Sequence, residues 1–72
     1  MENKEIEQAV NYFKTGNFIT AKKKLSELIE KSPNNHSLHN LLGVVLINQK
    51  KFDQAIVSFK ESIQINPDFA QG

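Results

Sequence analysis

Two histidines, His36 and His39, are the residues whose type and spacing come nearest to metal chemistry. On a helix they would stand one turn apart on the same face. Zinc requires three or four ligands, and the sequence has two histidines and no cysteine. Asp53 or a glutamate would have to complete such a site from elsewhere. We therefore expect two surface histidines near the start of a helix, and neither a metal site nor another cofactor.

Catalytic groupings are not recognisable in the sequence. It has no cysteine nucleophile, no glycine-rich phosphate-binding loop and no serine in a tight strand-to-helix turn. The carboxylates of Glu2, Glu5 and Glu7 lie near the N-terminus, where they suit the positive end of a helix dipole. The sequence therefore predicts a protein that is not an enzyme.

The nine lysines are the groups that would have to bind an anion. The sequence also has eight acidic residues, so the net charge is only +1. Arginine, the residue preferred for phosphate and base recognition, is absent. The run Lys22-Lys23-Lys24 points in three directions on a helix, so we expect a solvated face there. Nucleic acid and membrane surfaces are not expected partners.

Length and hydropathy limit the class of protein further. A chain of 72 residues without cysteine is one small domain that must be stabilised by helix packing alone. The N-terminus does not resemble a secretory signal, and the longest apolar stretch, residues 41–47, is far shorter than a membrane span. A soluble, cytoplasmic protein is the expectation.

An internal repeat organises the elements that carry these residues. An offset of 34 residues aligns the chain with itself at identical residues across the whole period. The identical pairs are Val10/Val44, Phe18/Phe52, Ala21/Ala55, Glu27/Glu61, Ile29/Ile63 and Pro33/Pro67. Apolar residues at i, i+3, i+4 and i+7 predict two helices in each copy, the second pair over about 36–48 and 52–65.

Turn residues predict where these helices begin and end. Gly16 can end the first helix in a left-handed conformation and Asn17 can cap the second, while Asn34 or Asn35 can cap the third. Pro33 must stop the second helix near Lys31. Lys50 takes the place of Gly16 in the second copy, at a cost of about 1–2 kcal/mol if the site needs positive φ.

Small residues recur where helices should touch, at Ala9 and Gly43 in the first helix of each copy and at Ala21 and Ala55 in the second. Small side chains allow two helix axes to approach closely. We expect larger residues such as Phe59 to fill the space beside them.

This 34-residue unit resembles the tetratricopeptide repeat. The second copy carries the resemblance at Leu42, Gly43, Leu46, Phe52, Ala55, Phe59 and Pro67; the first carries it at Ala9, Tyr12, Gly16, Phe18, Ala21, Leu25 and Pro33. Gln8 stands where the family prefers leucine, and Glu5 and His39 stand where it has tryptophan, as in a degenerate terminal repeat.

The resemblance implies an all-α fold of two tandem antiparallel helix–turn–helix hairpins, stacked as a short right-handed α-solenoid. The repeats would span 2–35 and 36–69 of one domain covering 1–72, and residues 70–72 would begin a third repeat of a longer array.

The resemblance also implies a function, a scaffold that binds a protein or peptide in a concave groove lined by the first helix of each repeat. The groove positions would be Asn3, Ile6, Val10, Phe13, Lys14, Ser37, Asn40, Leu41, Val44, Ile47, Asn48 and Gln71. Several of the apolar ones would equally suit packing inside the hairpin stack. Some family members bind a C-terminal carboxylate with cations, but the matching positions here hold Ile6, Val10, Leu41 and Gln71, so that ligand is not expected.

The last helix suggests a second use of the fold. Its apolar residues Ile56, Phe59, Ile63 and Ile65, with Phe69 beyond, would be left partly bare and would favour self-association. A homo-oligomerisation module is therefore an alternative function. The N-terminal appendage of a larger enzyme is a further alternative, as is an RNA-binding helical repeat, which would want a cationic groove.

Overall fold

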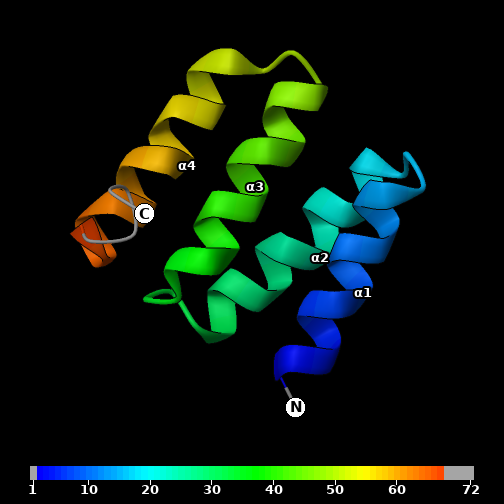
Figure 1. Cartoon of the computed structure of the whole chain (residues 1–72), viewed down its shortest axis with the longest axis horizontal. Helices are drawn as coiled ribbons and strands as arrows, with labels where there is room; N and C mark the ends of the chain where they lie inside the picture. The colour runs from blue at the N-terminus through cyan, green and yellow to red at the C-terminus, as the bar shows by residue number, and fades with distance from the viewer. Residues whose placement is uncertain (1, 68–72) are drawn as a thin grey trace.

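Four α-helices make up the fold, as the sequence predicts. The computed structural model describes residues 2–67, with side chains from Lys4 onward. The helices are α1 (Glu2–Lys14), α2 (Phe18–Lys31), α3 (His36–Asn48) and α4 (Phe52–Ile65). Figure 1 shows α1 and α2 as one antiparallel hairpin and α3 and α4 as another beside it. The predicted site residues Phe69 and Gln71, the segment 70–72 and the side chain of Asn3 lie outside the described residues.

The same turn closes both hairpins. The amide of Asn17 donates to the carbonyl of Tyr12 at 2.8 Å, and the amide of Lys51 donates to that of Leu46, 34 residues later, at the same distance. This six-residue closure places one residue in the left-handed region. That residue is Gly16 in the first hairpin (φ 83°) and Lys50 in the second (φ 63°). The second turn therefore needs positive φ. Lys50 adopts this conformation although it has a Cβ atom, which makes positive φ less favourable than for glycine.

The N-terminal cap predicted for α3 is present in the structure, whereas the one predicted for α2 is not. The side chain of Asn35 accepts from the amide of Ser37 at 3.0 Å, so Asn35 caps α3. Asn17 occupies the corresponding position of α2, but its side chain makes no cap hydrogen bond. The expectation that Asn17 caps α2 is wrong, because its amide group donates backward to the Thr15 hydroxyl at 3.1 Å.

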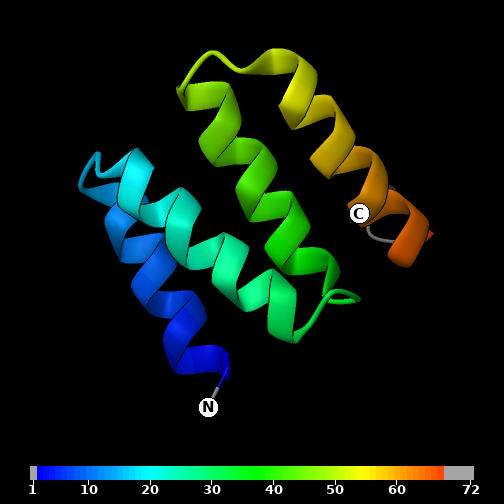
Figure 2. The same cartoon turned by 180° about the vertical axis from the view of Figure 1, so that it is seen from behind.

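The core lies where the two hairpins meet. Helix α2 lies between α1 and α3 in both views of the ribbon (Figures 1 and 2). Its buried residues Ala21, Leu25 and Leu28 form one cluster with Ala9 of α1 and with Leu38 and Val45 of α3. Because one cluster serves both hairpins, the described residues fold around a shared core.

In the second hairpin, the ring of Phe59 on α4 packs directly against Gly43 of α3. A Cβ atom on Gly43 would lie 2.7 Å from the ring of Phe59, so the ring occupies the space that a side chain at position 43 would take. The expectation that a large residue fills the space beside a small one is confirmed here. No helix within residues 2–67 is both long and apolar enough to cross a membrane.

Candidate partner-binding groove

The first helices of the two hairpins meet along one apolar seam. Helix α1 contacts α3 directly, and four of the predicted groove residues, Val10, Phe13, Leu41 and Val44, line a single small hollow. Its volume is about 10 Å³, and Leu25 of α2 forms part of its wall. The floor is thus filled by half-buried side chains. A partner would lie on this surface and would not insert deeply into it.

The α1 side of the seam is hollowed and polar at its rim. Ile6, Val10, Glu7, Asn11 and Lys14 line a shallow depression of about 390 Å³. Ile6 and Val10 are half-buried, whereas the three polar residues are exposed. The predicted groove residues Ile6, Val10 and Lys14 are therefore brought together on one face of α1.

The α3 side carries an exposed isoleucine and several polar groups. Ile47 is exposed, and Ser37 and Asn40 are half-buried. The amide nitrogen of the exposed Asn48 donates to the carbonyl of Val44 in its own helix at 2.9 Å. The two residues predicted to supply amide groups are thus half-buried at Asn40 and exposed at Asn48.

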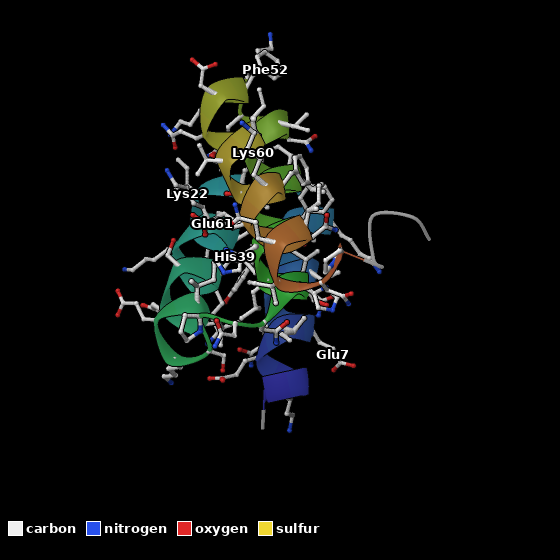
Figure 3. The ribbon with its side chains drawn as sticks, turned by 90° about the vertical axis from the view of Figure 1, so that its left-hand side faces the viewer. Glu7, Lys22, His39, Phe52, Lys60 and Glu61 are labelled. Atoms are coloured by element: carbon white, nitrogen blue, oxygen red, sulfur yellow. The ribbon has the colours of Figure 1, made fainter. Side chains whose placement is uncertain are left out.

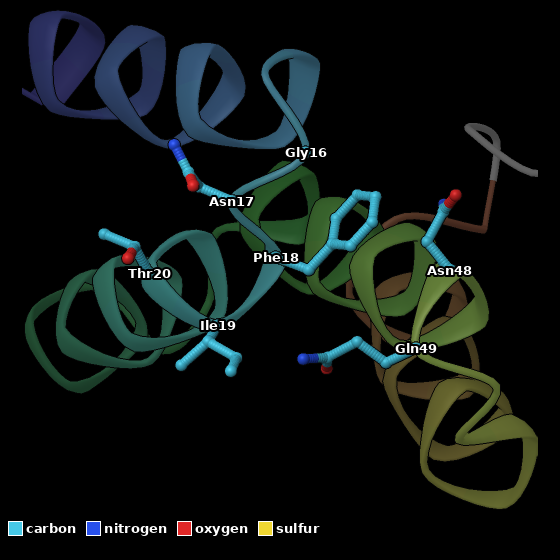
Figure 4. A pocket seen from close by; sticks show the side chains of 7 residues that line it. All are labelled: Gly16, Asn17, Phe18, Ile19, Thr20, Asn48 and Gln49. Atoms are coloured by element: carbon cyan, nitrogen blue, oxygen red, sulfur yellow. The ribbon is translucent and has the colours of Figure 1, made fainter.

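A second depression, which the sequence reasoning did not identify, continues from the Asn48 end. Figure 4 shows Phe18 and Ile19 facing Asn48 and Gln49 across it. Its volume is about 560 Å³, with the turn at Gly16 and Asn17 completing its lining. The ring of Phe18 packs on that of Phe13, with 5.6 Å between centroids, and so joins this depression to the groove floor. The only sequence signal was Ile19, an apolar residue off the buried face of its helix.

The two histidines are not the surface pair that the sequence suggested. His39 is only 5% exposed, and His36 is half-buried. The Nε2 of His39 lies 2.8 Å from the carbonyl oxygen of Pro33, and its Nδ1 lies 3.1 Å from a carboxylate oxygen of Glu61 (Figure 3). The expectation failed because the helix turns His39 toward α4, into the place where the family has a tryptophan.

These histidines belong to a polar cluster at the base of the second hairpin. The buried hydroxyl of Ser62 donates to the carbonyl of His36 at 3.0 Å, and the amide of Asn66 lies 3.2 Å from the His36 ring. Among residues 2–67, no group of three or more His, Cys, Asp or Glu side chains is suited to hold a metal ion. The cluster joins α3, α4 and the turn between the hairpins.

The lysine run is only partly solvated. Lys23 is exposed, but Lys22 and Lys24 are half-buried. The Nζ of Lys24 lies 3.6 Å from a carboxylate oxygen of Glu5, which ties α2 to α1. The pKa of Lys22 is lowered by a side-chain contact with Lys51, by burial and by the like charge of that lysine. Two members of the run thus link elements, which the sequence alone did not show.

The predicted self-association residues divide into two groups. Ile56 and Ile63 are 51% and 44% exposed, whereas Phe59 and Ile65 are half-buried. Phe59 is not left bare, because its ring lies against Gly43 of the same hairpin. Phe52, which is 57% exposed, extends the exposed apolar surface of α4 toward its N-terminus.

The fold is that of an all-α helical-repeat protein, with four helices packed as adjacent pairs. Residues 36–69 match the family model described as "Tetratricopeptide repeat". The second hairpin is therefore a tetratricopeptide repeat, and the four helices are consistent with two such hairpins in tandem. Such repeats are in general modules of protein–protein interaction and are typically not catalytic. Searches among curated proteins and among solved structures returned no significant match.

Proposed function

We propose that this protein is a non-catalytic scaffold that binds a peptide segment of a partner protein in the groove between α1 and α3. The observation that carries the proposal is the convergence of Val10, Phe13, Leu41 and Val44, from two helices, on one half-buried surface. Apolar side chains of the partner would cover this floor. The amides of Asn40 and Asn48 would meet its polar groups at the edge.

The composition of the groove selects the kind of peptide. Ile6, Val10 and Leu41 stand at the positions where a carboxylate-binding groove of this family would need polar or cationic groups. A carboxylate placed on them would lose hydration without gaining a partner. Lys14 lies at the rim only. The favoured ligand is therefore an internal, largely uncharged segment with apolar residues on one side.

The test uses a 12-residue random peptide library displayed on phage and selected on the 72-residue protein. The affinity of the selected peptides is then measured by calorimetry for three variants. Val44→Glu places a charge on the floor and should weaken binding more than about tenfold, and Asn40→Ala should weaken it about three- to tenfold. Val57→Glu, on the exposed side of α4, is the control and should bind like the parent.

Equal affinity of the parent, Val44→Glu and Asn40→Ala would place the peptide elsewhere and overturn the groove assignment. Far-UV circular dichroism of each variant separates loss of binding from loss of fold.

A further inference from the structure

The exposed side of α4 carries an apolar stripe, whereas its equivalent in α2 is half-buried and is interrupted by Lys22. Phe52, Ile56 and Ile63 are each between 44% and 57% exposed. At 100° per residue they fall within about 40° of one another on the helix. Helix α4 is also the outermost helix on the side opposite α1 (Figures 1 and 2). We name these three residues the α4 stripe.

Comparison with α2 shows that the stripe is more apolar than hairpin stacking requires. In α2, the residue equivalent to Ile56 is Lys22, although α2 is covered by the next hairpin. A helix that only had to pack under another hairpin could therefore keep a lysine at this position. The isoleucine at position 56 points to an apolar neighbour over the outer part of α4.

A second copy cannot cover the stripe with its α1 in the way that α3 covers α2. Helix α3 joins the shared core through Leu38, Leu42 and Val45. The equivalent residues of α1, listed in the same order, are Lys4, Gln8 and Asn11, and all three are exposed. Head-to-tail stacking would bury these polar groups against apolar ones, which costs free energy without a compensating bond.

Charges beside the stripe suit α4 itself as the partner. Asp53 and Lys60 lie on the same flank of the stripe, seven residues apart. In an antiparallel pair of α4 helices related by a twofold axis, the same flanks meet, and Phe52 lies beside Ile63 of the second copy. Asp53 then lies within about 3 Å, measured along the axis, of Lys60 of the second copy. In a parallel pair the flanks lie on opposite edges, so these charges do not meet.

We infer that two copies of this chain associate through an antiparallel, twofold-symmetric pairing of their α4 stripes. The contact is small, since a helix of 14 residues is about 21 Å long. An interface of this size lies below the roughly 1,200 Å² of stable complexes, so the dissociation constant should fall between about 10 µM and 1 mM. The pairing leaves the groove between α1 and α3 open in both copies.

Sedimentation equilibrium of the 72-residue chain, from about 20 µM to about 2 mM, tests the inference against this range. A monomer–dimer equilibrium is expected, and Ile56→Gln should raise its dissociation constant about tenfold. Ile19→Gln is the matched control, because Ile19 is 79% exposed but lies on α2, away from the stripe and its charged flank. It should change the dissociation constant less than about twofold.

Charge reversal tests the antiparallel direction. Asp53→Lys and Lys60→Asp should each weaken the dimer, whereas their equimolar mixture and the double variant should both restore it at low salt. Circular dichroism verifies that each variant remains helical.

Four outcomes would overturn the inference. They are a monomer throughout the concentration range, growth into open-ended oligomers, equal effects of Ile56→Gln and Ile19→Gln, and single charge reversals without effect.

Discussion

At the scale of single residues, His39 is a buried polar side chain with a polar contact on each ring nitrogen. Its Nε2 faces the Pro33 carbonyl, which only accepts, so this nitrogen carries a proton. Its Nδ1 lies 3.1 Å from a carboxylate oxygen of Glu61. The ring of His39 thus links the turn at Pro33 to helix α4 through one polar contact on each nitrogen.

Removal of this link should destabilise the fold. His39→Leu keeps the apolar volume but leaves the Pro33 carbonyl without its donor, and the free energy of unfolding should fall by about 1–3 kcal/mol. Glu61→Gln replaces the carboxylate beside Nδ1 and should cost about 0.5–1 kcal/mol, since Glu61 is half exposed. Urea denaturation measures both values.

The first hairpin provides the control for the histidine link. Glu27 is the equivalent of Glu61, and position 5, the equivalent of His39, holds a glutamate. Glu27→Gln should therefore leave stability within about 0.5 kcal/mol of the parent. If Glu27→Gln and Glu61→Gln cost the same, the His39 contact contributes nothing specific.

Lys50 and Gly16 make a second matched pair of positions. Lys50→Gly should raise the free energy of unfolding by about 0.5–1 kcal/mol, because φ of 63° strains any residue with a Cβ atom. That gain corresponds to a rise in Tm of about 2–8 °C in a domain of this size. Gly16→Ala should lower stability by about 1 kcal/mol, and since a Cβ there meets nothing within 4 Å, the loss is purely conformational. Thermal scans of both variants that moved Tm in the same direction would contradict this assignment.

At the scale of the elements, the two hairpins pack their two helices together with different pairs of residues at equivalent positions. The first hairpin places Ala9 and Leu25 in the shared core. The second places Gly43 and Phe59 at the equivalent positions, with the ring lying where the missing side chain would be. The smaller residue of one helix is thus matched by the larger residue of the other, so total volume is conserved.

Exchange of this pair should show strong coupling. Gly43→Ala alone should destabilise by about 1 kcal/mol, because the Phe59 ring must move despite the better helix propensity of alanine. In a Phe59→Leu background the same substitution should stabilise by about 0.5–1 kcal/mol, since only the propensity gain remains. A double-mutant cycle by urea denaturation should give a coupling energy of about 1.5–2 kcal/mol. Additive effects would show that the ring does not restrict position 43.

The helices themselves were predictable from the sequence, because apolar periodicity and turn residues are local signals. The bounds 36–48 and 52–65 agree with the expectation, and Pro33 ends α2 at Lys31 as expected. The left-handed turn at Lys50 was recognised only through its alignment with Gly16. Asn17 was misassigned as a cap, since the competing bond to Thr15 depends on side-chain rotamers that no sequence pattern specifies.

The convergence of the apolar residues proposed to line the groove was predictable from the sequence, but their surroundings were not. The repeat register brought Val10, Phe13, Leu41 and Val44 to one face, and the structure places them around one hollow. The buried setting of His39 was not predictable, because it depends on how α3 rotates against α4. Polar residues at a position usually occupied by a large aromatic one look like surface residues until the packing is known.

At the scale of the whole molecule, the two ends of the stack differ in character. The outer face of α1 presents Lys4, Gln8 and Asn11, whereas α4 presents the apolar stripe of Phe52, Ile56 and Ile63. A polar outer face is the kind of surface that keeps the end of a helical stack soluble. The stack formed by the described helices is therefore asymmetric, polar on the outer face of α1 and apolar along α4.

The two hairpins also meet through a pair of like charges, and that contact leads to the last prediction. Lys22 of the first hairpin lies against Lys51 of the second, and this contact, burial and repulsion lower the pKa of Lys22 from 10.5. A lowered lysine pKa means that the folded state disfavours the charged form. The penalty is present at neutral pH and disappears as pH rises through the lowered pKa toward 10.5.

Lys51→Gln should therefore stabilise the protein at pH 7, by a few tenths of a kcal/mol and at most about 1 kcal/mol, because the pair is largely solvated. The gain should shrink in about 1 M salt and again as the pH approaches 10.5, where more than half of Lys22 is already neutral in the parent because its pKa is lowered. Lys23→Gln removes the same charge from an exposed position of α2 and is the control. Urea denaturation of both variants at low salt and at about 1 M salt separates repulsion between Lys22 and Lys51 from an effect of net charge. An equal gain from Lys23→Gln would show that net charge, and not the contact between hairpins, limits the stability of the stack.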